Sequence, residues 1–579
     1  MSSLARWLVQ EAAWRTLSPQ VVQKIAALAV ADMEMAYGTT PNLNDLVTLS
    51  KLGTTGSYSN NVHRDLFGCK LTQSDLPTNI VSIPMKLQIT KPPVNCVQTL
   101  LLPHRLFAHW YNHHPGVFQK RICPSPQALE SFWIATEAAG HPALVGHDMC
   151  ARANWRQRAV PIKLHGDGVP ITGAGKAWSK SVDVYSWNSI MGTGTTLELE
   201  FLVWLVHASQ CSKTGVLTTD TKLKFYHHFC ASLTKLYNGV DDNGDVLCPG
   251  HGYFGVPWVI SGDLDWFYKE YGLANCNSNE PCFYCQCNST TVPWRNLVPD
   301  AEWTRCIHTD ASFQAHNNPL HPLLSLPFVT VFQLWADWMH SKHLGSDKYY
   351  AGSVFWVLVY EILGDTASNN LARVWDEIVL VYKSRKTKSR YGNMHLGMFC
   401  DPKHPTDAKF PELKGKAAEV AHLMPCLLQV FQQFKTPGNV VHDMIELGLM
   451  SSCTADAKLE EHAGVNVLPA QAANEVKHLV FSFMLAQNYL CTHYGNIGLK
   501  LFNIVPKSHY MSHLGIMAKY FNPRQAWAYM GEDFMQKVKK LAGGCSRGIK
   551  AHKLEPKVMK HYCTGLYFLL VDPSCWWKQ

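Results

Sequence analysis

The chain has 579 residues, of which 47% are hydrophobic and 17% are charged, and its formal net charge is +8. This composition excludes an intrinsically disordered chain, and the length is enough for roughly two to four domains with a substantial core. The mild positive charge is compatible with an anionic partner without identifying one. The 19 cysteines are odd in number and widely spread, which argues against a secreted disulfide framework.

Membrane insertion and secretion are not expected. The most apolar stretch, residues 353–363, is too short to cross a bilayer and contains Glu361. The N-terminus also lacks the order of basic, apolar and small residues that marks a signal peptide. We therefore expect an intracellular protein.

The first 158 residues divide into two regions. Residues 1–78 are predicted to be helical, with Ser18 as an N-cap before Pro19. Such a region could bind a nucleic acid or serve in packing, and without a recognition-helix signature we favour packing. Residues 79–158 are mixed and rich in histidine and aromatic residues, as in the run from His109 to His114. Because no second ligand group stands at a matching spacing, we interpret this run as half-buried packing and not as a metal site.

From residue 159 the pattern changes to strands. The alternation of Leu197 and Leu199 with polar residues favours a half-buried strand, and Gly239 ends a helix that Asp220 could cap. The predicted order is three strands, a helix and a fourth strand, over residues 159–164, 182–191, 196–206, 220–239 and 256–260.

Three acids are candidates for catalysis. Asp167 is expected where the first strand stops, between two glycines, and Asp263 where the fourth strand stops. Glu532 is expected at the start of a C-terminal helix, with Asp533 and Glu475 as alternatives. Hard divalent cations prefer carboxylate oxygens, so acids that converge could hold Mg²⁺ or Mn²⁺. The competing interpretation is that aspartates at strand ends belong to turns and that acids in a first helical turn complement the macrodipole.

A cysteine pair and a histidine pair have the spacing of zinc ligands. Cys282 and Cys285 form a CxxC motif, which is half of a structural zinc site. His509 and His513 are four residues apart and would share one face of a helix. A zinc ion bound by all four side chains would connect segments that are distant in sequence.

Alternatives to this zinc site remain open. Cys276 and Cys287 lie close enough to the CxxC motif for an all-cysteine site. Asp337, His340 and His343 form a second polar group that could bind metal or the DNA backbone, or could be a hydrogen-bonded buried cluster. His340 and His343 also compete with the distant histidine pair as partners of the cysteines.

A dense basic cluster is a candidate for phosphate contacts. It could equally be a nuclear localisation signal, and charge runs often form only a solvated face. Its members are Lys383, Arg385, Lys386, Lys388 and Arg390.

Taken together, the acids and the metal-ligand pairs resemble one group of DDE transposases. In that group a CxxC motif follows the second acid and a histidine pair precedes the third, as Cys282–Cys285 and His509–His513 do here. The arrangement is similar to that of the V(D)J recombinase core and of the Transib, hAT, CACTA, Plavaka and Kyakuja-Dileera-Zisupton elements. The segment from Asp337 to Gly345 resembles the D-x-x-H-x-x-x-x-G segment of the last two.

The resemblance implies a ribonuclease H-like mixed-sheet core, interrupted by a large α-helical insertion, with the first and fourth strands adjacent. The expected regions are a helical N-terminal region (1–78), a mixed region (79–158), the first part of the core (159–285), the helical insertion (286–505) and the last part of the core with a basic tail (506–579). Asp167, Asp263 and Glu532 would bind two Mg²⁺ or Mn²⁺ ions, and a structural Zn²⁺ would be bound by Cys282, Cys285, His509 and His513.

The implied function is cleavage and transfer of double-stranded DNA at transposon ends by a homo-oligomer in the nucleus. Two alternatives remain: an inactive transposase-derived protein that binds DNA, and a zinc-stabilised interaction protein without nuclease activity. The DNA sequence recognised, and the choice between hairpin and nicking chemistry, are not encoded in any motif that can be identified.

Overall fold

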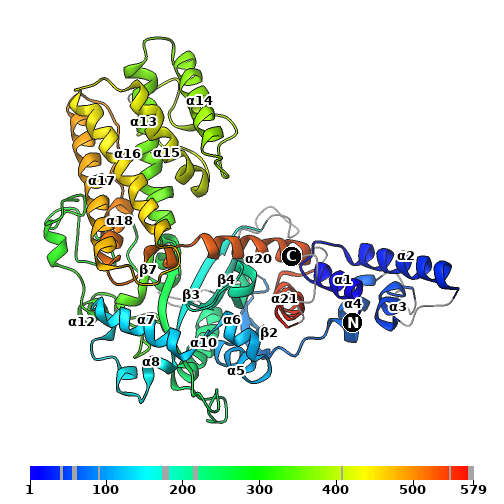
Figure 1. Cartoon of the computed structure of the whole chain (residues 1–579). Helices are drawn as coiled ribbons and strands as arrows, with labels where there is room; N and C mark the ends of the chain where they lie inside the picture. Colours follow the sequence, from blue (N-terminus) through cyan, green and yellow to red (C-terminus); the bar gives the residue numbers. More distant parts are fainter. Residues whose placement is uncertain are drawn as a thin grey trace. The chain divides into compact units, whose positions relative to one another are not determined.

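The protein is described by a computed structural model that covers residues 1–38, 43–54, 61–88, 91–171, 181–212, 220–405, 409–546 and 549–571 (Figure 1). It consists of two compact units. The first contains residues 1–129, 153–258 and 530–579, and the second contains residues 130–152 and 259–529.

The first unit combines helices with most of the sheet strands. Its helices are α1 (Ser3–Ala13), α2 (Pro19–Tyr37), α3 (Asn44–Ser50), α4 (Val62–Gly68), η1 (Lys70–Thr72), α5 (Pro103–His113), α6 (Pro115–Arg121), α8 (Trp155–Arg158), α9 (Thr196–Leu199), η4 (Ala208–Gln210), α10 (Asp220–Asn238), α20 (Tyr529–Ser546), η10 (Ala551–Lys553) and α21 (Leu554–Leu570). Its strands are β1 (Asn79–Met85), β2 (Val94–Leu100), β3 (Ala159–Val169), β4 (Val182–Ser189), β5 (Phe201–His207) and the first part of β6 (Phe254–Gly262).

The second unit is mainly helical. Its helices are α7 (Pro126–Ala138), η2 (Pro142–Leu144), η3 (Asp148–Ala151), α11 (Leu264–Tyr271), η5 (Glu302–Arg305), α12 (Asp310–His316), η6 (Val331–Gln333), η7 (Met339–Ser346), α13 (Asp347–Val357), η8 (Leu358–Ile362), α14 (Ala367–Ser384), η9 (Leu396–Met398), α15 (Ala417–Phe434), α16 (Val440–Glu461), α17 (Ala470–Asn496), α18 (Pro506–Met517) and α19 (Pro523–Ala526). Its strand β7 (Leu334–Ala336) pairs with β6.

A mixed five-stranded sheet has the order β5-β4-β3-β6-β7. The pairs β3–β4 and β4–β5 are antiparallel, whereas β6 and β7 are parallel. The expected adjacency of the first and fourth predicted strands, β3 and β6, is therefore confirmed. The coarse fold class, a mixed α/β sheet with an additional helical region, is confirmed as well.

The third predicted strand begins later than the sequence pattern suggests. Residues 196–199 form the short helix α9, and the strand β5 begins only at Phe201. The reason is local, because Glu198 accepts a hydrogen bond from the main-chain N–H of Thr195 at 2.8 Å and completes a capping box. The residues whose apolar–polar alternation predicted a strand, Thr196–Leu199, therefore form a helical turn instead. That part of the strand prediction is wrong.

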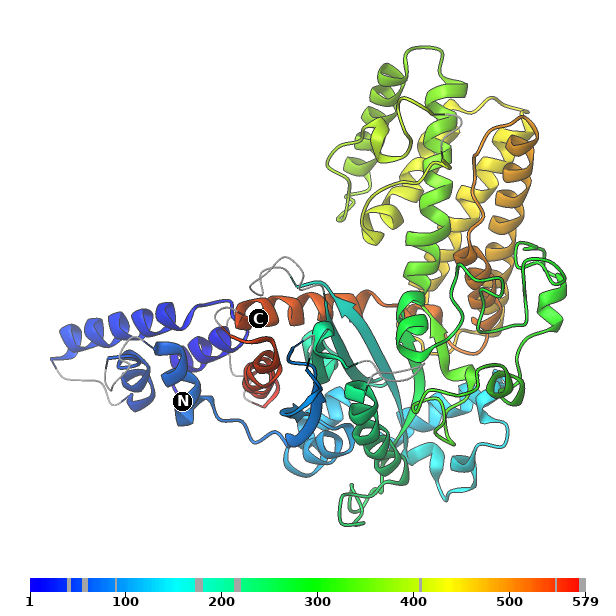
Figure 2. The same cartoon turned by 180° about the vertical axis from the view of Figure 1, so that it is seen from behind.

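The two faces of the sheet are covered by different helices of the first unit. Tyr185 of β4 packs against an aromatic ring of α10. The register pairs Tyr185 with Gly166 of β3, so His165 and Asp167, on either side of Gly166, face the opposite side. On that side α20 crosses the β3–β4 pair (Figures 1 and 2). Gly531 of α20 is so close to His165 that a Cβ atom at this glycine would lie 2.3 Å from Nε2 of the imidazole.

The N-terminal region is helical, as expected, and shares one hydrophobic core with the C-terminal helix. Apolar side chains of α1, α2, α3 and α4 pack together with Phe568 of α21. His561 of α21 donates from Nδ1 to the carbonyl oxygen of Ala13 at 3.2 Å. Residues 1–78 thus pack against the C-terminal helix.

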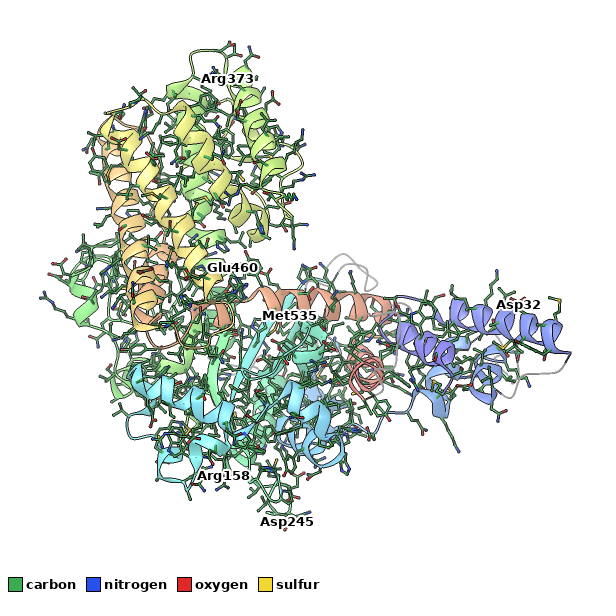
Figure 3. The ribbon with its side chains drawn as sticks, in the orientation of Figure 1. Asp32, Arg158, Asp245, Arg373, Glu460 and Met535 are labelled. Atoms are coloured by element: carbon green, nitrogen blue, oxygen red, sulfur yellow. The ribbon has the colours of Figure 1, made fainter. Side chains whose placement is uncertain are left out.

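The second unit contains a bundle formed by α13, α15, α16, α17 and α18 (Figure 1). Glu460 of α16, labelled in Figure 3, forms an ion pair with Arg524 of α19. The strand β7 lies inside residues 286–505, the range for which the sequence predicts a helical insertion. With only three residues, β7 is too short for its periodicity to be detected. Among the described residues, no helix is both long and apolar enough to span a bilayer.

Replacing Gly531 tests the packing of α20 on β3. Alanine in a helix interior is normally more stable than glycine by about 1 kcal/mol. At Gly531, however, the added methyl group would overlap His165, and we expect Gly531→Ala to destabilise the protein by about 1–3 kcal/mol in urea unfolding. Gly543→Ala in the same helix is the control, because nothing lies within 4 Å of its Cβ position. Equal stability of the two variants would contradict the packing.

Candidate metal centre and acidic residues

A buried cysteine–histidine cluster lies in the second unit, where α18 meets the turns that follow α11. Sγ of Cys285 is 3.3 Å from Nε2 of His509 and 3.3 Å from Nε2 of His513. The two histidine nitrogens are 3.1 Å apart. α18 positions both imidazoles on one face, because residues four apart lie one above the other on a helix.

These separations fit a tetrahedral zinc site. Zinc bonds of about 2.3 Å to sulfur and about 2.0–2.1 Å to nitrogen place two nitrogens about 3.3 Å apart and a nitrogen about 3.5 Å from a sulfur. The observed distances between the potential ligand atoms of Cys285, His509 and His513 are close to these values. The cluster therefore has the donor atoms and the size that zinc requires.

Cys287 is a further member of the cluster. The ligand atoms of Cys282, Cys285, Cys287 and His509 all lie within 4.8 Å of one another. The structure thus groups Cys287, and not His513, with the other three ligands. The predicted set with His513 as the fourth ligand is the alternative, since His513 lies next to Cys285 and His509. Cys276 is not part of this group, so the all-cysteine alternative is not supported in the part of the chain that the structure describes.

The surroundings of the cluster orient its ligands and exclude water. The imidazole Nδ1 of His509 donates to the carbonyl oxygen of Trp294 at 3.1 Å, which leaves Nε2 directed at the cysteines. The ring of Trp303 covers both histidines, with centroids 4.6 Å away. Burial raises the pKa of the Cys282 thiol and lowers the pKa of His513, whereas hydrogen bonds from the neighbouring thiols lower the pKa of Cys287 well below its usual range.

Asp337 and His340 form a separate hydrogen-bonded pair. Asp337, directly after β7, accepts hydrogen bonds from Nδ1 of His340 at 2.6 Å and from its main-chain N–H at 2.9 Å. Its other oxygen accepts from the N–H of Ala528 at 2.7 Å and of Met339 at 3.1 Å. Burial alone would raise the pKa of Asp337, but these hydrogen bonds outweigh it and lower the pKa. The Asp337 carboxylate thus accepts four hydrogen bonds, which fix the neighbouring backbone and the His340 ring.

His343 belongs to a different network. Its Nε2 is 3.1 Å from Asp456, and its Nδ1 is 2.8 Å from the hydroxyl of Tyr529. The buried ammonium of Lys342 lies 2.6 Å from Asp456 and 2.7 Å from Asp347. Because Lys342 already supplies the positive charge between the two carboxylates, a metal ion is not needed there. Asp337 and His340 thus form the hydrogen-bonded buried cluster of the alternative interpretation, without His343, and Cys282 and Cys285 are grouped with His509 instead of His340 or His343.

The predicted catalytic acids occupy the expected elements, with one difference. Asp167 lies inside β3, which continues to Val169, and accepts a hydrogen bond from the N–H of Gly168 at 2.7 Å. Glu532 is in the first turn of α20. Both belong to the first unit, where α20 packs on the face of β3 that carries Asp167.

Asp263 belongs to the second unit, whereas Asp167 and Glu532 belong to the first. Asp263 is the N-cap of α11, and its carboxylate accepts from the N–H of Trp266. The register pairs the last residue of β6 with the last residue of β7, so Asp263 and Asp337 leave adjacent parallel strands at the same edge. Lys507, which the sequence analysis did not single out, lies near both acids. Burial lowers the pKa of Lys507, while both aspartates act in the opposite direction.

The alternative third acids are less suited to metal binding. Glu475 on α17 is paired with Lys458 at 3.0 Å, which already neutralises it. Asp533 lies 3.9 Å from Lys537 one turn further along α20. Glu532 therefore remains our choice.

The predicted basic cluster is exposed at the end of α14. Lys383 is in the last turn, Arg385 is the C-cap, and Lys386, Lys388 and Arg390 follow. All five side chains are exposed, and cations at this end of a helix complement its dipole. The structure thus gives a local reason for these charges that is independent of DNA.

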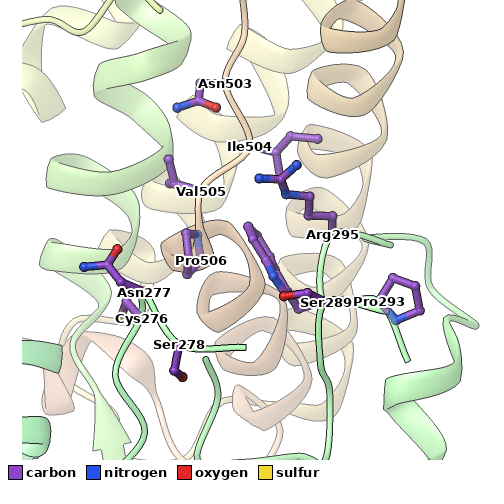
Figure 4. Close-up of a pocket in the computed structure, with 11 residues that line it drawn as sticks. Cys276, Asn277, Ser278, Ser289, Pro293, Arg295, Asn503, Ile504, Val505 and Pro506 are labelled. Atoms are coloured by element: carbon purple, nitrogen blue, oxygen red, sulfur yellow. The ribbon is translucent and has the colours of Figure 1, made fainter. Parts of the chain in front are cut away.

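A cavity of about 540 Å³ lies beside the metal centre in the second unit (Figure 4). Cys276 and Asn277 line one side, and Arg295 and Asn503 line another. Trp294, whose carbonyl oxygen accepts from His509, is also part of the wall. The cavity could accommodate a small polar group, but no cluster of acids lines it.

No protein-family model matches this sequence, and no curated protein has a similar sequence.

Ligand substitutions test the metal centre. We expect purified wild-type protein to contain zinc at this cluster, and Cys285→Ser or His509→Asn to lose it, because both four-ligand sets require these residues. Cys287→Ser and His513→Asn should each retain zinc with lower affinity, because four donors remain. Metal analysis after gel filtration gives the zinc content. Unchanged zinc in Cys285→Ser would contradict the assignment.

The network around Lys342 predicts a large loss of stability in Lys342→Met. This change leaves Asp347 and Asp456 without their buried counter-charge, which typically costs about 3–5 kcal/mol. Urea unfolding monitored by circular dichroism measures the loss. Lys269→Met is the control, because Lys269 is exposed and pairs with Asp265 at the surface, so its stability should remain unchanged.

Proposed function

We propose that the protein is a transposase-type polynucleotidyl transferase that cleaves and transfers DNA strands with the help of divalent metal ions. The main supporting observation is the sheet order, in which β3 and β6, the strands associated with Asp167 and Asp263, are neighbours. A second is that α20, which carries Glu532, packs on the face of β3 to which Asp167 belongs. Antiparallel β3–β4–β5 and parallel β6–β7 form the mixed sheet that a ribonuclease H-like core requires.

In this proposal Asp167, Asp263 and Glu532 bind two Mg²⁺ or Mn²⁺ ions. Their carboxylate oxygens fit these ions, which are hard and prefer oxygen ligands. When bound, such ions activate the attacking oxygen and stabilise the leaving oxygen of a phosphodiester.

Other residues would position the acids. The Asp337 carboxylate accepts a hydrogen bond from the main-chain N–H of Ala528, directly before α20 begins at Tyr529. This hydrogen bond would fix the segment that leads to Glu532. Gly168, which is exposed and has no side chain, leaves the backbone directly after Asp167 accessible to close approach. A zinc ion at the cysteine–histidine cluster would join the turns after α11 to α18 and so hold the two ends of the helical insertion together.

The partners follow from the same proposal. Double-stranded DNA would be the substrate, and the exposed basic cluster at the end of α14 would contact its phosphates, which makes binding sensitive to salt. A homo-oligomer would be needed to join two transposon ends. Nuclear localisation is part of the proposal, since the substrate is genomic DNA.

A nicking assay tests the catalytic proposal. We expect purified full-length protein to nick supercoiled plasmid in the presence of Mn²⁺. Asp167→Asn, Asp263→Asn and Glu532→Gln should each reduce the rate at least about a hundredfold, since changes to groups that only support a metal ligand already cost 10–100-fold.

Two matched controls distinguish loss of a ligand from a general effect of charge. Asp265→Asn on α11 and Asp533→Asn on α20 each remove an acid near a proposed ligand and should retain nicking. If all three single variants nick the plasmid at the wild-type rate, the proposal is contradicted. Salt-sensitive DNA binding without nicking by the wild type would identify an inactive DNA-binding relative, and absence of both would favour a zinc-stabilised interaction protein.

A further inference from the structure

Three potential metal ligands converge in the first unit, two of them from the histidine-rich run that the sequence analysis interprets as packing. They are Asp75, in the segment between η1 and β1, His109 in α5, and His114 directly after α5. Their ligand atoms all lie within 4.8 Å of one another. Nε2 of His109 is 3.5 Å from one oxygen of Asp75, and Nε2 of His114 is 3.2 Å from the other.

The end of α5 explains why these two histidines meet. His109 and His113 have the four-residue spacing that places side chains on one helix face, yet His113 is exposed and is not part of the group. The helix ends at His113, and His114 has φ −136° and ψ 62°, outside the helical region. This turn of the backbone brings the His114 ring to 5.1 Å from the His109 ring.

Hydrogen bonds do not account for every polar atom of this group. His109 is only 9% exposed, and its Nε2 is buried without a hydrogen-bond partner of normal geometry among the described residues. A buried Nε2 that lies close to a carboxylate and to a second imidazole is placed as a metal ligand would be.

The distances also fit a bound ion. Bonds of about 2.0–2.1 Å from zinc to nitrogen and about 2.0–2.2 Å to oxygen place a nitrogen and an oxygen ligand about 3.4 Å apart in a tetrahedral site. The observed values of 3.2 and 3.5 Å bracket this separation. Hydrogen bonds would favour about 2.9 Å for both pairs.

We propose that Asp75, His109 and His114 bind a divalent transition-metal ion of the zinc class. Two imidazoles and one carboxylate suit zinc, cobalt or nickel, whereas magnesium and calcium select sites with oxygen ligands. Three protein ligands leave a coordination position for water or another small ligand, and Asp75 is half exposed, so this position is accessible from solvent. The proposal is independent of the transposase function.

The site would have a structural consequence. Asp75 lies in the segment that connects the helical region 1–72 to β1, while both histidines belong to α5 and its end. A bound ion would tie this connection to α5 and so reduce its conformational freedom. The exposed surface of the ion would remain able to bind an exogenous ligand such as imidazole.

Cobalt binding distinguishes this site from the cysteine–histidine cluster. Purified full-length protein is titrated with Co²⁺ and read by absorption, because cobalt bound to thiolates has a charge-transfer band that cobalt bound only to histidine and carboxylate lacks. We expect wild type to bind one equivalent without thiolate character in addition to the thiolate site. Asp75→Asn and His114→Gln should lose that equivalent and retain the thiolate band, which also shows that they are folded. Zinc content should fall by one ion per chain in parallel.

His113→Gln is the matched control, because it removes an exposed histidine next to the site that is not one of the proposed ligands. It should bind both equivalents. The proposal is overturned if wild type shows no thiolate-free equivalent, if Asp75→Asn and His114→Gln bind cobalt as wild type does, or if His113→Gln abolishes the thiolate-free equivalent.

Discussion

The convergence of cysteines and histidines from two distant segments is the constraint on which the second unit depends. Cys285 and His509 are separated by 224 positions in sequence, and their side chains are 3.3 Å apart. The entropic cost of closing such a loop grows only with the logarithm of its length, so a long helical segment can be accommodated between the two ends. A buried thiol–imidazole cluster gains little without a metal, because burial opposes the charged forms of its members. A bound zinc ion would turn these groups into a strong connection.

The acids at the sheet depend on backbone register more than on local sequence. The pairing of Gly166 with Tyr185 decides that His165 and Asp167 face α20, and a shift by one residue would turn both to the other face. Asp337, directly after β7, accepts a hydrogen bond from the N–H of Ala528, the residue before α20. The candidate site is therefore a product of strand order, register and one buried carboxylate together.

Most long elements could be predicted from the sequence because their patterns are strong. The helix α10 is predicted from its limits at Asp220 and Gly239, and the strand β6 is predicted at residues 256–260. Short elements could not be predicted. The sequence of α9 has the apolar–polar alternation typical of a strand, and β7 has only three residues. Helical spacing predicted that His509 and His513 share one face of a helix, but it did not predict that Cys287 would join His509 in the cluster.

The ligands that the sequence could not assign have partners from other elements. His343 is directed to Asp456 of α16, and the sequence offers no local indication of this contact. His109 was interpreted as packing because no partner stands at a regular spacing, and Asp75 comes from the segment before β1. The end of a helix, which changes direction at His114, is not visible in periodicity alone. Such sites depend on tertiary packing, which one sequence cannot reveal.

The interior ammonium of Lys342 illustrates how differently a buried charge can be compensated. A lysine side chain is a cation attached to the chain by covalent bonds, so it is present from synthesis and does not exchange with solution. The cysteine–histidine cluster, in contrast, would acquire its ion from the surroundings. Chelators and changes in metal supply would act on that cluster but not on the carboxylates around Lys342. The charge balance around Lys342 is therefore independent of the supply of metal ions.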